Sequence, residues 1–298
     1  MKDFFKKLGI FLIPFPLYIG LVILLDPYNF FNVSHVITQE TKKETSAKFN
    51  PQLWKLVEFK HIKADRIILG DSRSAQVNAE HLKQSTGSEF YNFSYAGGTL
   101  IDMIETFWYA ADMQNLKEAY FGINFNLYND FERNNGVEQA RSILKNMFSY
   151  SFSKVVFKTM VQNIKKQYFV KDFTLGEPDM NRDEFWKYQL NSMGIRFYQK
   201  YKHPDQYLKQ LTEIADYCKA NDIELVFFMP PTHVELQQRI TDFKLEKDYN
   251  RFIEDISTLG KYYNLDVPSD YTQNRKNFND PFHPVNDSLI VNSIWIRN

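Results

Sequence analysis

Short apolar runs alternate with segments of helical periodicity over much of the chain, and this alternation constrains the fold more than any other feature. Four runs have the length of buried strands: "DRIILG" (65–70), "EFYNFSY" (89–95), "EAYFGINF" (118–125) and "IELVFFMP" (223–230). Residues 99–113 and 204–222 instead repeat apolar side chains at helical spacing. Such alternation is typical of a parallel sheet with helices on both faces. We therefore expect an α/β fold, a three-layer α/β/α sandwich with a parallel central sheet.

Two segments do not follow this alternation. Residues 131–203 contain aromatic-rich amphipathic pieces and no clear strand, which favours a helical insertion beside the sheet that could serve as a lid. Residues 29–50 run into the polar stretch "TQETKKETSAKFNP", and we expect them to form a linker. The main domain is then expected over residues 51–298.

The N-terminal region carries a membrane signal. Residues 8–25 are 18 consecutive uncharged and mostly apolar positions, just enough to cross a bilayer as a helix. Asp26 is the first charge after this run, whereas three lysines precede it: Lys2, Lys6 and Lys7. The positive-inside rule places the N-terminus in the cytoplasm and the rest of the chain across the membrane. No small-residue cleavage pattern follows, which favours an uncleaved anchor over residues 1–28 rather than a removed signal peptide; a buried N-terminal helix is the other alternative.

Composition narrows the function classes. Lys+Arg and Asp+Glu number 36 each, so the main electrostatic reason to expect nucleic-acid binding is missing. The single cysteine, Cys218, lies in a helical pattern and cannot form a disulfide within one chain. The histidines show no metal-ligand spacing, and no Walker loop or dinucleotide-binding glycine pattern occurs. We therefore expect no metal and no cofactor.

The stretch "ILGDSRS" places polar chemistry directly after a strand. Gly70 permits a sharp turn, and Ser72 would then sit at a helix N-terminus, where free N–H groups favour a developing anion. A seryl hydroxyl is a weak nucleophile and needs a base held by a third group. Asp71 and Arg73 are expected to support the site, and Arg73 either pairs with Asp71 or contacts a substrate oxygen.

A base of this kind lies near the end of the chain. In "FNDPFHPVND", Asp280 and His283 are three residues apart, so the carboxylate can orient the imidazole while its other nitrogen faces Ser72. The two side chains could instead be a hydrogen-bonded pair in a loop. His233, after the fourth run, is a rival base that we expect to lie at the rim or to contact substrate, because no carboxylate precedes it at short spacing.

Two further segments could supply donors to an oxyanion. The turn "NFSYAGGTL" offers the backbone N–H of Gly97 or Gly98, although a plain turn also needs glycine. The third run offers the side chain of Asn124, or failing it that of Asn126; Asn124 could equally be a cap at the strand end.

In this order the motifs resemble the four sequence blocks of the SGNH/GDSL hydrolase superfamily. The blocks are Gly70-Asp71-Ser72, the Gly97-Gly98 turn, Gly122-Ile123-Asn124 and Asp280-Pro281-Phe282-His283. The resemblance covers residues 60–298 and is strongest in the first and last blocks. It implies a flavodoxin-like sandwich with Ser72 as nucleophile, His283 as base and Asp280 as its orienting acid. Phe125 stands where the third block usually carries an aspartate.

The "GDSR" form behind an anchor is similar to the branch that includes alginate O-acetylation proteins and the lipoteichoic-acid D-alanylation protein. This implies an extracytoplasmic O-acyltransferase that acts on a cell-envelope polysaccharide or teichoic-type polymer, often with a membrane-bound O-acyltransferase as partner. A carbohydrate O-acetylesterase would carry the same residues. A non-catalytic assembly module of the same fold is a third hypothesis, which the altered third block keeps open.

Overall fold

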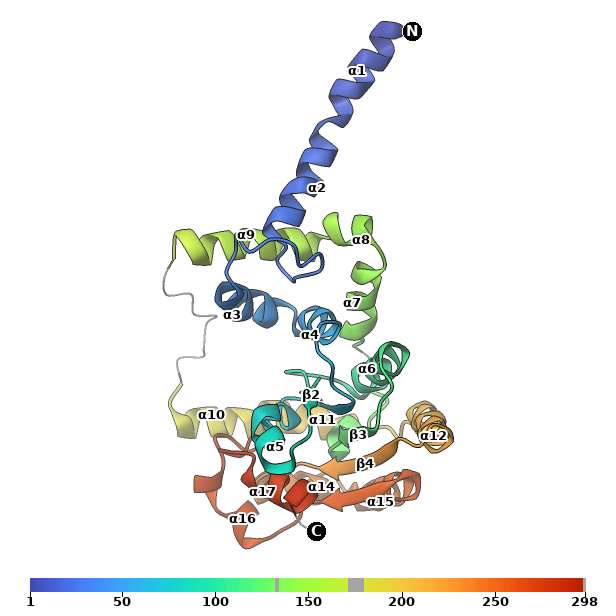
Figure 1. Ribbon diagram of the computed structural model, residues 1–298. Helices are drawn as coiled ribbons and strands as arrows, with labels where there is room; N and C mark the ends of the chain where they lie inside the picture. Colours follow the sequence, from blue (N-terminus) through green and yellow to red (C-terminus); the bar gives the residue numbers. More distant parts are fainter. Residues whose placement is uncertain (132–133, 171–179, 297–298) are drawn as a thin grey trace. The chain divides into compact units, whose positions relative to one another are not determined.

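The computed structural model describes residues 1–131, 134–170 and 180–296. The chain forms two compact units (Figure 1). Unit 1 comprises Met1–His61 and Val137–Glu177, and unit 2 comprises Ile62–Gly136 and Pro178–Asn298. This division differs from the expected one, because the start of the expected main domain and much of residues 131–203 belong to unit 1.

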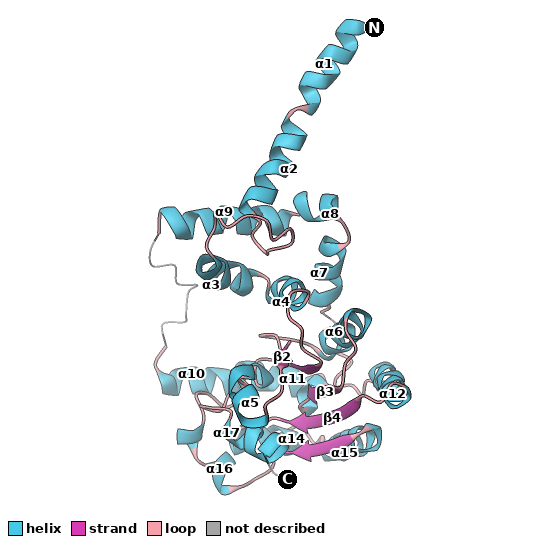
Figure 2. Ribbon diagram, in the orientation of Figure 1, coloured by secondary structure: helices cyan, strands magenta, loops and turns pink. Residues whose placement is uncertain are grey.

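Unit 2 contains a five-stranded sheet in which every neighbouring pair is parallel (Figure 2). The order is β2-β1-β3-β4-β5, with β1 at Arg66–Gly70, β2 at Phe90–Asn92, β3 at Glu118–Gly122, β4 at Glu224–Met229 and β5 at Lys261–Asn264. The four expected strands are confirmed, and so is an α/β fold with a parallel sheet flanked by helices. The sequence does not reveal β5, since its four residues are only partly buried and carry no continuous apolar run.

Helices pack against both faces of this sheet. On one face, Ile68 of β1 and Val226 of β4 belong to a buried cluster with Leu82 of α5 (Ala79–Thr86) and Ile290 of α17 (Ser288–Val291). On the other face, Phe121 contacts Phe227 and also Phe107 of α6 (Leu100–Met113). The remaining helices of unit 2 are α10 (Arg182–Tyr188), α11 (Gly194–Gln199), α12 (Asp205–Ala220), α13 (Val234–Gln237), α14 (Arg239–Asp242), α15 (Glu246–Leu259) and α16 (Asp270–Gln273).

The described part of unit 1 is helical. Its helices are α1 (Lys2–Leu12), α2 (Pro14–Leu25), α3 (Gln39–Phe49), α4 (Pro51–Phe59), α7 (Gly136–Leu144), α8 (Met147–Ser151) and α9 (Lys154–Tyr168). Ile13 has helical backbone angles, so α1 and α2 form one rod, and Lys2–Leu25 is long and apolar enough to cross a membrane. Gly136 belongs to unit 2 by its contacts, although α7 begins there.

The linker expected over residues 29–50 is wrong for its second half, which forms α3. Polar composition was misleading there because α3 buries polar side chains, and Thr45 and Ser46 hydrogen-bond to Asn163 of α9. The helical insertion expected over 131–203 consists mostly of helices joined by short turns in its described part, and it is shared between the two units. Residues 132–133 and 171–179 of that expectation lie outside the described residues.

Candidate active site

Ser72 lies two residues after Gly70, the last residue of β1, at the edge of the sheet where the parallel strands end. Gly70 is in register with Gly122 of β3, and Ser74 lies against both glycines. A Cβ atom on either glycine would collide with the Ser74 side chain. These glycines are therefore required by close packing beneath the turn that carries Ser72, rather than by an unusual backbone angle.

The helix expected directly after Ser72 is a single 3₁₀ turn, Ser74–Gln76, and α5 begins only at Ala79. The turn ends at Val77, whose backbone is extended, and the Asn92 side chain donates to the carbonyls of Ser74 and Val77. Because so short a turn has almost no macrodipole, the expectation that a helix N-terminus supports Ser72 is wrong.

Ser72, His283 and Asp280 form a continuous hydrogen-bonded chain. Ser72 Oγ lies 2.7 Å from His283 Nε2, and His283 Nδ1 lies 2.7 Å from Asp280 Oδ2. Since a carboxylate only accepts, Nδ1 carries the proton and Nε2 is free to accept from the Ser72 hydroxyl. The three side chains are thus arranged as nucleophile, base and orienting acid.

The loop that carries Asp280 and His283 is held by backbone contacts. The Phe282 N–H donates to Asp280 Oδ1 at 2.8 Å, which leaves Oδ2 for the imidazole. The His233 N–H donates to the Pro281 carbonyl at 2.9 Å and ties this loop to the start of α13. Asp280 is buried, so its carboxylate depends on the Phe282 N–H and the His283 imidazole in place of water.

Arg73 forms the structural ion pair that the sequence allowed. Its guanidinium donates to both carboxylate oxygens of Asp71, the shortest contact being 2.6 Å, and is 1% exposed. Its Nη1 also donates to Asn126 Oδ1 at 2.9 Å. With its partners inside the protein, Arg73 fixes the turn at Asp71 and the side chain of Asn126.

Asn124 does not face the serine. Its Nδ2 donates to the Pro230 carbonyl at 2.8 Å and to Asp266 Oδ2 at 3.2 Å, and it does not line the cavity beside Ser72. Asp266 is partly buried, and desolvation raises the pKa of its carboxyl group. The assignment of Asn124 to an oxyanion hole is therefore wrong, because its amide group already donates to two acceptors inside the protein.

Asn126 lines the cavity with Ser72, and its Nδ2 has no acceptor among the described residues. The backbone N–H of Gly98 donates to the Tyr95 carbonyl at 3.0 Å, so Gly98 has no free donor. By contrast, the N–H groups of Ser72 and Gly97 find no acceptor in the described part of the chain. The available donors are therefore Ser72 N–H, Gly97 N–H and Asn126 Nδ2.

The helix N-terminus beside this site belongs to α6. Thr99 is its N-cap and forms a capping box with Asp102, and both Thr99 and Leu100 line the cavity. A helix of this length presents a positive dipole end there, which stabilises a nearby anion. The T-x-x-D spacing after Gly98 is the sequence signal that could have indicated it.

A cavity of about 290 Å³ opens beside Ser72 and His283. Its polar wall holds Asn126 and the Gly97-Gly98 turn, and its apolar wall includes Leu100, Leu127 and Phe282. The segment 189–197 adds four further lining residues: Gln189, Met193, Arg196 and Phe197. This volume lies at the lower end of small-molecule sites, large enough for a short acyl group and part of its carrier.

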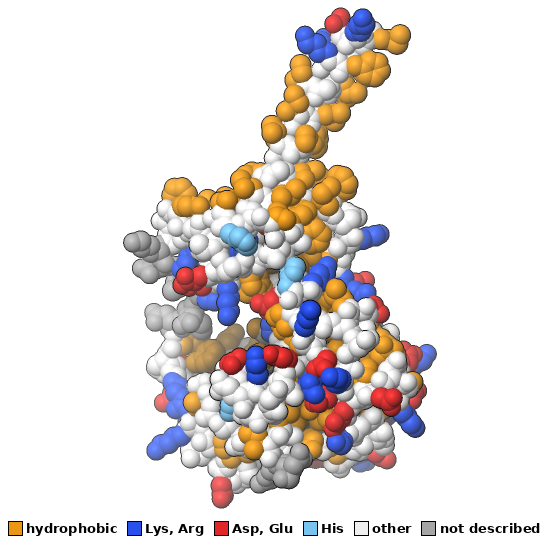
Figure 3. Space-filling view, in the orientation of Figure 1, with side chains coloured by type: hydrophobic (Ala, Val, Ile, Leu, Met, Phe, Trp, Pro, Cys, Tyr) orange, Lys and Arg blue, Asp and Glu red, His pale blue; other side chains and the backbone are white. Residues whose placement is uncertain are grey.

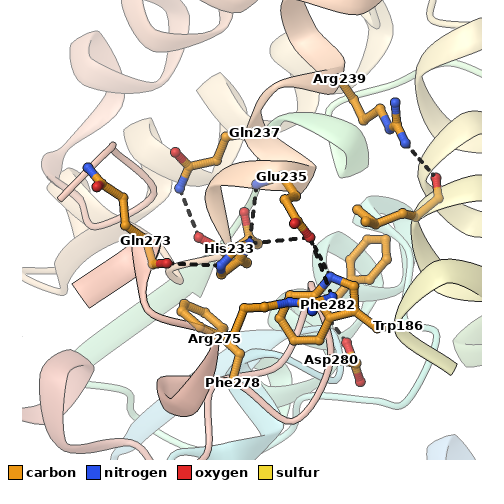
Figure 4. A network of polar contacts seen from close by, with 12 residues as sticks. Trp186, His233, Glu235, Gln237, Arg239, Gln273, Arg275, Phe278, Asp280 and Phe282 are labelled. Carbon is orange, nitrogen blue, oxygen red and sulfur yellow. Dashed lines mark hydrogen bonds and ion pairs between the residues drawn. The ribbon is translucent and has the colours of Figure 1, made fainter. Parts of the chain in front are cut away.

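His233 is not at the cavity. Its Nδ1 accepts from the Glu235 N–H at 3.3 Å and its Nε2 lies 3.3 Å from the Gln273 carbonyl, so the ring caps α13 (Figure 4). The ring is 3% exposed, and burial lowers the pKa of its imidazole. The expectation of a rim or substrate-contacting residue is wrong, since the fourth strand leads His233 into a packed interior.

The network around His233 also includes Trp186 of α10, the helix that precedes the cavity-lining segment 189–197 (Figure 4). Trp186 of α10 is buried, donates from Nε1 to Glu235, and packs edge-on against His233. The Arg275 guanidinium lies 4.2 Å from the centre of the Trp186 ring. These contacts tie α10, and the cavity-lining segment after it, to the same elements that hold the Asp280 loop. The sequence offered no signal for them beyond an aromatic residue in an amphipathic pattern.

No group of three or more potential metal ligands occurs among the described residues. Cys218 is buried in α12, as its helical pattern predicted, and burial raises the pKa of its thiol to about 12. A thiol in this setting is neither a nucleophile nor a ligand at neutral pH.

No protein-family model matches this chain, and no curated protein matches it.

Proposed function

We propose that this chain is a serine acyl-transfer enzyme of the SGNH type, with a three-layer sandwich fold. The observation that carries the proposal is the hydrogen-bonded chain from Asp280 through His283 to Ser72, on the wall of a cavity. An arrangement of this kind activates a hydroxyl for attack on an acyl carbonyl, and its geometry matters more than its position in the sequence.

The proposed reaction proceeds through a seryl ester. His283 Nε2 takes the Ser72 proton as Oγ bonds to the acyl carbonyl carbon, and Asp280 stabilises the imidazolium. The negative oxygen is held by the N–H groups of Ser72 and Gly97 and by Asn126 Nδ2. His283 then protonates the leaving group as its bond to the acyl carbon breaks.

The second half transfers the acyl group. A hydroxyl of the acceptor replaces the leaving group, gives its proton to His283 Nε2 and attacks the seryl ester. Collapse of this second tetrahedral intermediate releases the acylated acceptor and returns the proton to Ser72 Oγ. We propose an O-acetyl or similar acyl group, and a cell-envelope polysaccharide or teichoic-type polymer as acceptor; a membrane-bound O-acyltransferase is the proposed source of the acyl group.

We also propose that Lys2–Leu25 anchors the enzyme in the cell membrane, with the remainder outside the cytoplasm. The end of α2 supports an anchor over a removed signal peptide, because Val22, Leu25 and Asp26 are buried within unit 1. The Asp26 carboxylate accepts from the backbone N–H groups of Phe30, Phe31 and Asn32 and from the Tyr150 hydroxyl. Removing α2 would therefore expose part of the core of unit 1.

The test uses the full chain in lipid nanodiscs, an activated aryl acetate as donor and an envelope glycan as acceptor. We expect turnover that falls by about 10³-fold or more in Ser72→Ala, the usual cost of losing a triad member. Ser257→Ala, an exposed serine on α15, is the matched control. Acetyl found on the glycan supports a transferase, and acetate released only to water would make the enzyme an esterase. Turnover equal in wild type and Ser72→Ala would refute the proposal and leave a non-catalytic module.

A further inference from the structure

The outer surface of α8 and α9 in unit 1 is apolar although these helices belong to a folded unit. Phe148 of α8, Phe152 at the C-cap of α8 and Phe157 of α9 are each about half exposed, and Tyr168 at the end of α9 is 57% exposed. Single exposed apolar residues need no explanation, but a contiguous set on one surface marks a binding face. We call these four residues the aromatic collar.

Helical spacing separates α9 into a buried stripe and an outward apolar stripe. Val156, Thr159, Met160 and Asn163 are buried, and Asn163 bonds to α3. The outward stripe recurs at helical spacing: Phe157 and Tyr168 are exposed, and Val161 and Ile164 between them are half-buried. Figure 1 shows α9 between α3 and the foot of α2, and the buried stripe contacts α3 through Asn163.

Basic residues flank the outward stripe. Lys154, Lys158 and Lys165 form the next row around α9. Residues 139–170 contain six Lys or Arg and no Asp or Glu. An apolar stripe bordered by lysines is the pattern of a helix that lies in a membrane interface, with the lysine ammonium groups at the level of anionic headgroups.

The collar is continuous with the apolar rod. The Phe152 ring lies 6.4 Å from the ring of Phe15 and 5.5 Å from that of Tyr18, measured between centroids, and the Tyr18 hydroxyl donates to the Ser151 carbonyl. Figure 3 shows hydrophobic side chains that run along the rod and continue over the adjoining surface of unit 1. Phe15 and Tyr18 belong to α2, the half of the rod whose end is buried in unit 1, so the collar adjoins the rod on its unit 1 side.

We propose that the aromatic collar and the α9 lysines bind the surface of an anionic bilayer, so that unit 1 rests in the interface and is not merely tethered by one helix. This inference rests on the membrane anchor proposed above and not on the acyl-transfer chemistry. The bilayer is the occupant because the surface adjoins the rod and carries a positive charge that matches anionic lipid.

The experiment measures the depth of single labelled positions in the full chain, reconstituted in nanodiscs of anionic lipid. Cys218→Ala removes the buried native thiol, and a polarity-sensitive fluorophore is attached at Phe157→Cys, Ile10→Cys or Lys43→Cys. Ile10 is an exposed position of α1 that reports the rod, and Lys43 is an exposed position of α3 that serves as the control. We expect nitroxide at the headgroup end of the lipid chains to quench the Phe157 label, deep nitroxide to quench the Ile10 label, and neither to quench the Lys43 label.

A Phe157 label as unquenched as that at Lys43, with Ile10 quenched, would overturn the collar while leaving the anchor in place. An unquenched Ile10 label would refute the anchor and the collar together, without bearing on Ser72. Discs of zwitterionic lipid, and the Lys154→Gln, Lys158→Gln, Lys165→Gln triple variant in anionic discs, should both show weaker quenching at Phe157. Equal quenching of the Phe157 label in the original protein in anionic discs, in the same protein in zwitterionic discs and in the triple variant would contradict recognition of anionic lipid.

Discussion

Asn124 and Asn126 are two residues apart, yet their side chains have different roles. Asn124 donates hydrogen bonds to the Pro230 carbonyl and to the Asp266 carboxylate. Asn126 instead lines the cavity and accepts a hydrogen bond from Arg73. The sequence named both as candidates but could not choose between them, because the choice depends on Asp266, which follows the unrecognised strand β5.

This difference predicts a selective loss of activity in Asn126→Asp. The aspartate keeps an acceptor for Arg73 but replaces the Nδ2 donor with negative charge beside the developing oxyanion. We expect kcat to fall by about 10²-fold or more while the melting temperature changes little. Steady-state kinetics with an aryl ester and a thermal melt make the comparison. Unchanged kcat would remove Asn126 from the proposed oxyanion site.

His233 predicts a pH dependence of stability rather than of catalysis. Burial lowers the pKa of its imidazole; Glu235 opposes this shift, and Arg275 adds to it. As the pH falls below the ordinary histidine value of about 6.5, the unfolded chain takes up this proton before the folded chain does. The free energy of unfolding therefore decreases as the pH falls from about 6.5 toward the lower pKa of the folded state.

His233→Asn keeps an acceptor at the N-cap of α13 but cannot titrate. The drop in melting temperature between about pH 7.5 and about pH 5.5 should be smaller in this variant than in wild type. Differential scanning calorimetry of both proteins at both pH values provides the measurement. An equal drop in the two proteins would show that protonation of His233 is not the cause.

At the scale of elements, the ends of β1 and β3 pack directly beneath the turn that carries Ser72. Gly70 and Gly122 lie side by side, and the Ser74 side chain fills the space above them. Gly70 does not have a positive φ angle, so a larger residue there is excluded by volume alone. The packing therefore couples the strand ends to the position of Ser72.

Gly70→Ala should destabilise the protein by about 1–3 kcal/mol, the usual cost of overpacking. The double variant Gly70→Ala, Ser74→Gly should recover part of this loss, since Ser74 Oγ has no hydrogen-bond partner among the described residues. Denaturant unfolding of both single variants and the double variant gives the coupling free energy. Additive losses would mean that the two side chains do not compete for the same space.

At the scale of the whole molecule, the parallel sheet and the triad could be predicted from the sequence because each has a local signal. Four strands had continuous apolar runs, and the three-residue spacing of Asp280 and His283 indicated a hydrogen-bonded pair. The division into two units could not be predicted. The sequence of α3 is as polar as that of a linker, and α3 packs into unit 1 through buried polar side chains. The position of the cavity-lining segment 189–197 depends on the long-range contact between Trp186 and Glu235, which no local sequence pattern indicates.

The proposed anchor makes a prediction for the intact protein. Because the end of α2 is buried in unit 1 and Asp26 organises the following turn, the membrane-extracted chain should retain its N-terminal residues. Intact-mass measurement of protein purified from membranes reports this directly. A mass that lacks the first helices would identify a removed signal peptide instead of an anchor.

The measurement that tests the central claim most directly is the mass of the acylated chain. Full-length protein is mixed with an activated acyl donor, quenched in acid within the first turnover, digested and analysed by mass spectrometry. The account predicts one acyl group on the peptide that contains Ser72, and none in Ser72→Ala. Acylation of another residue, or none in a folded wild-type protein that turns over the donor, would contradict Ser72 as the nucleophile.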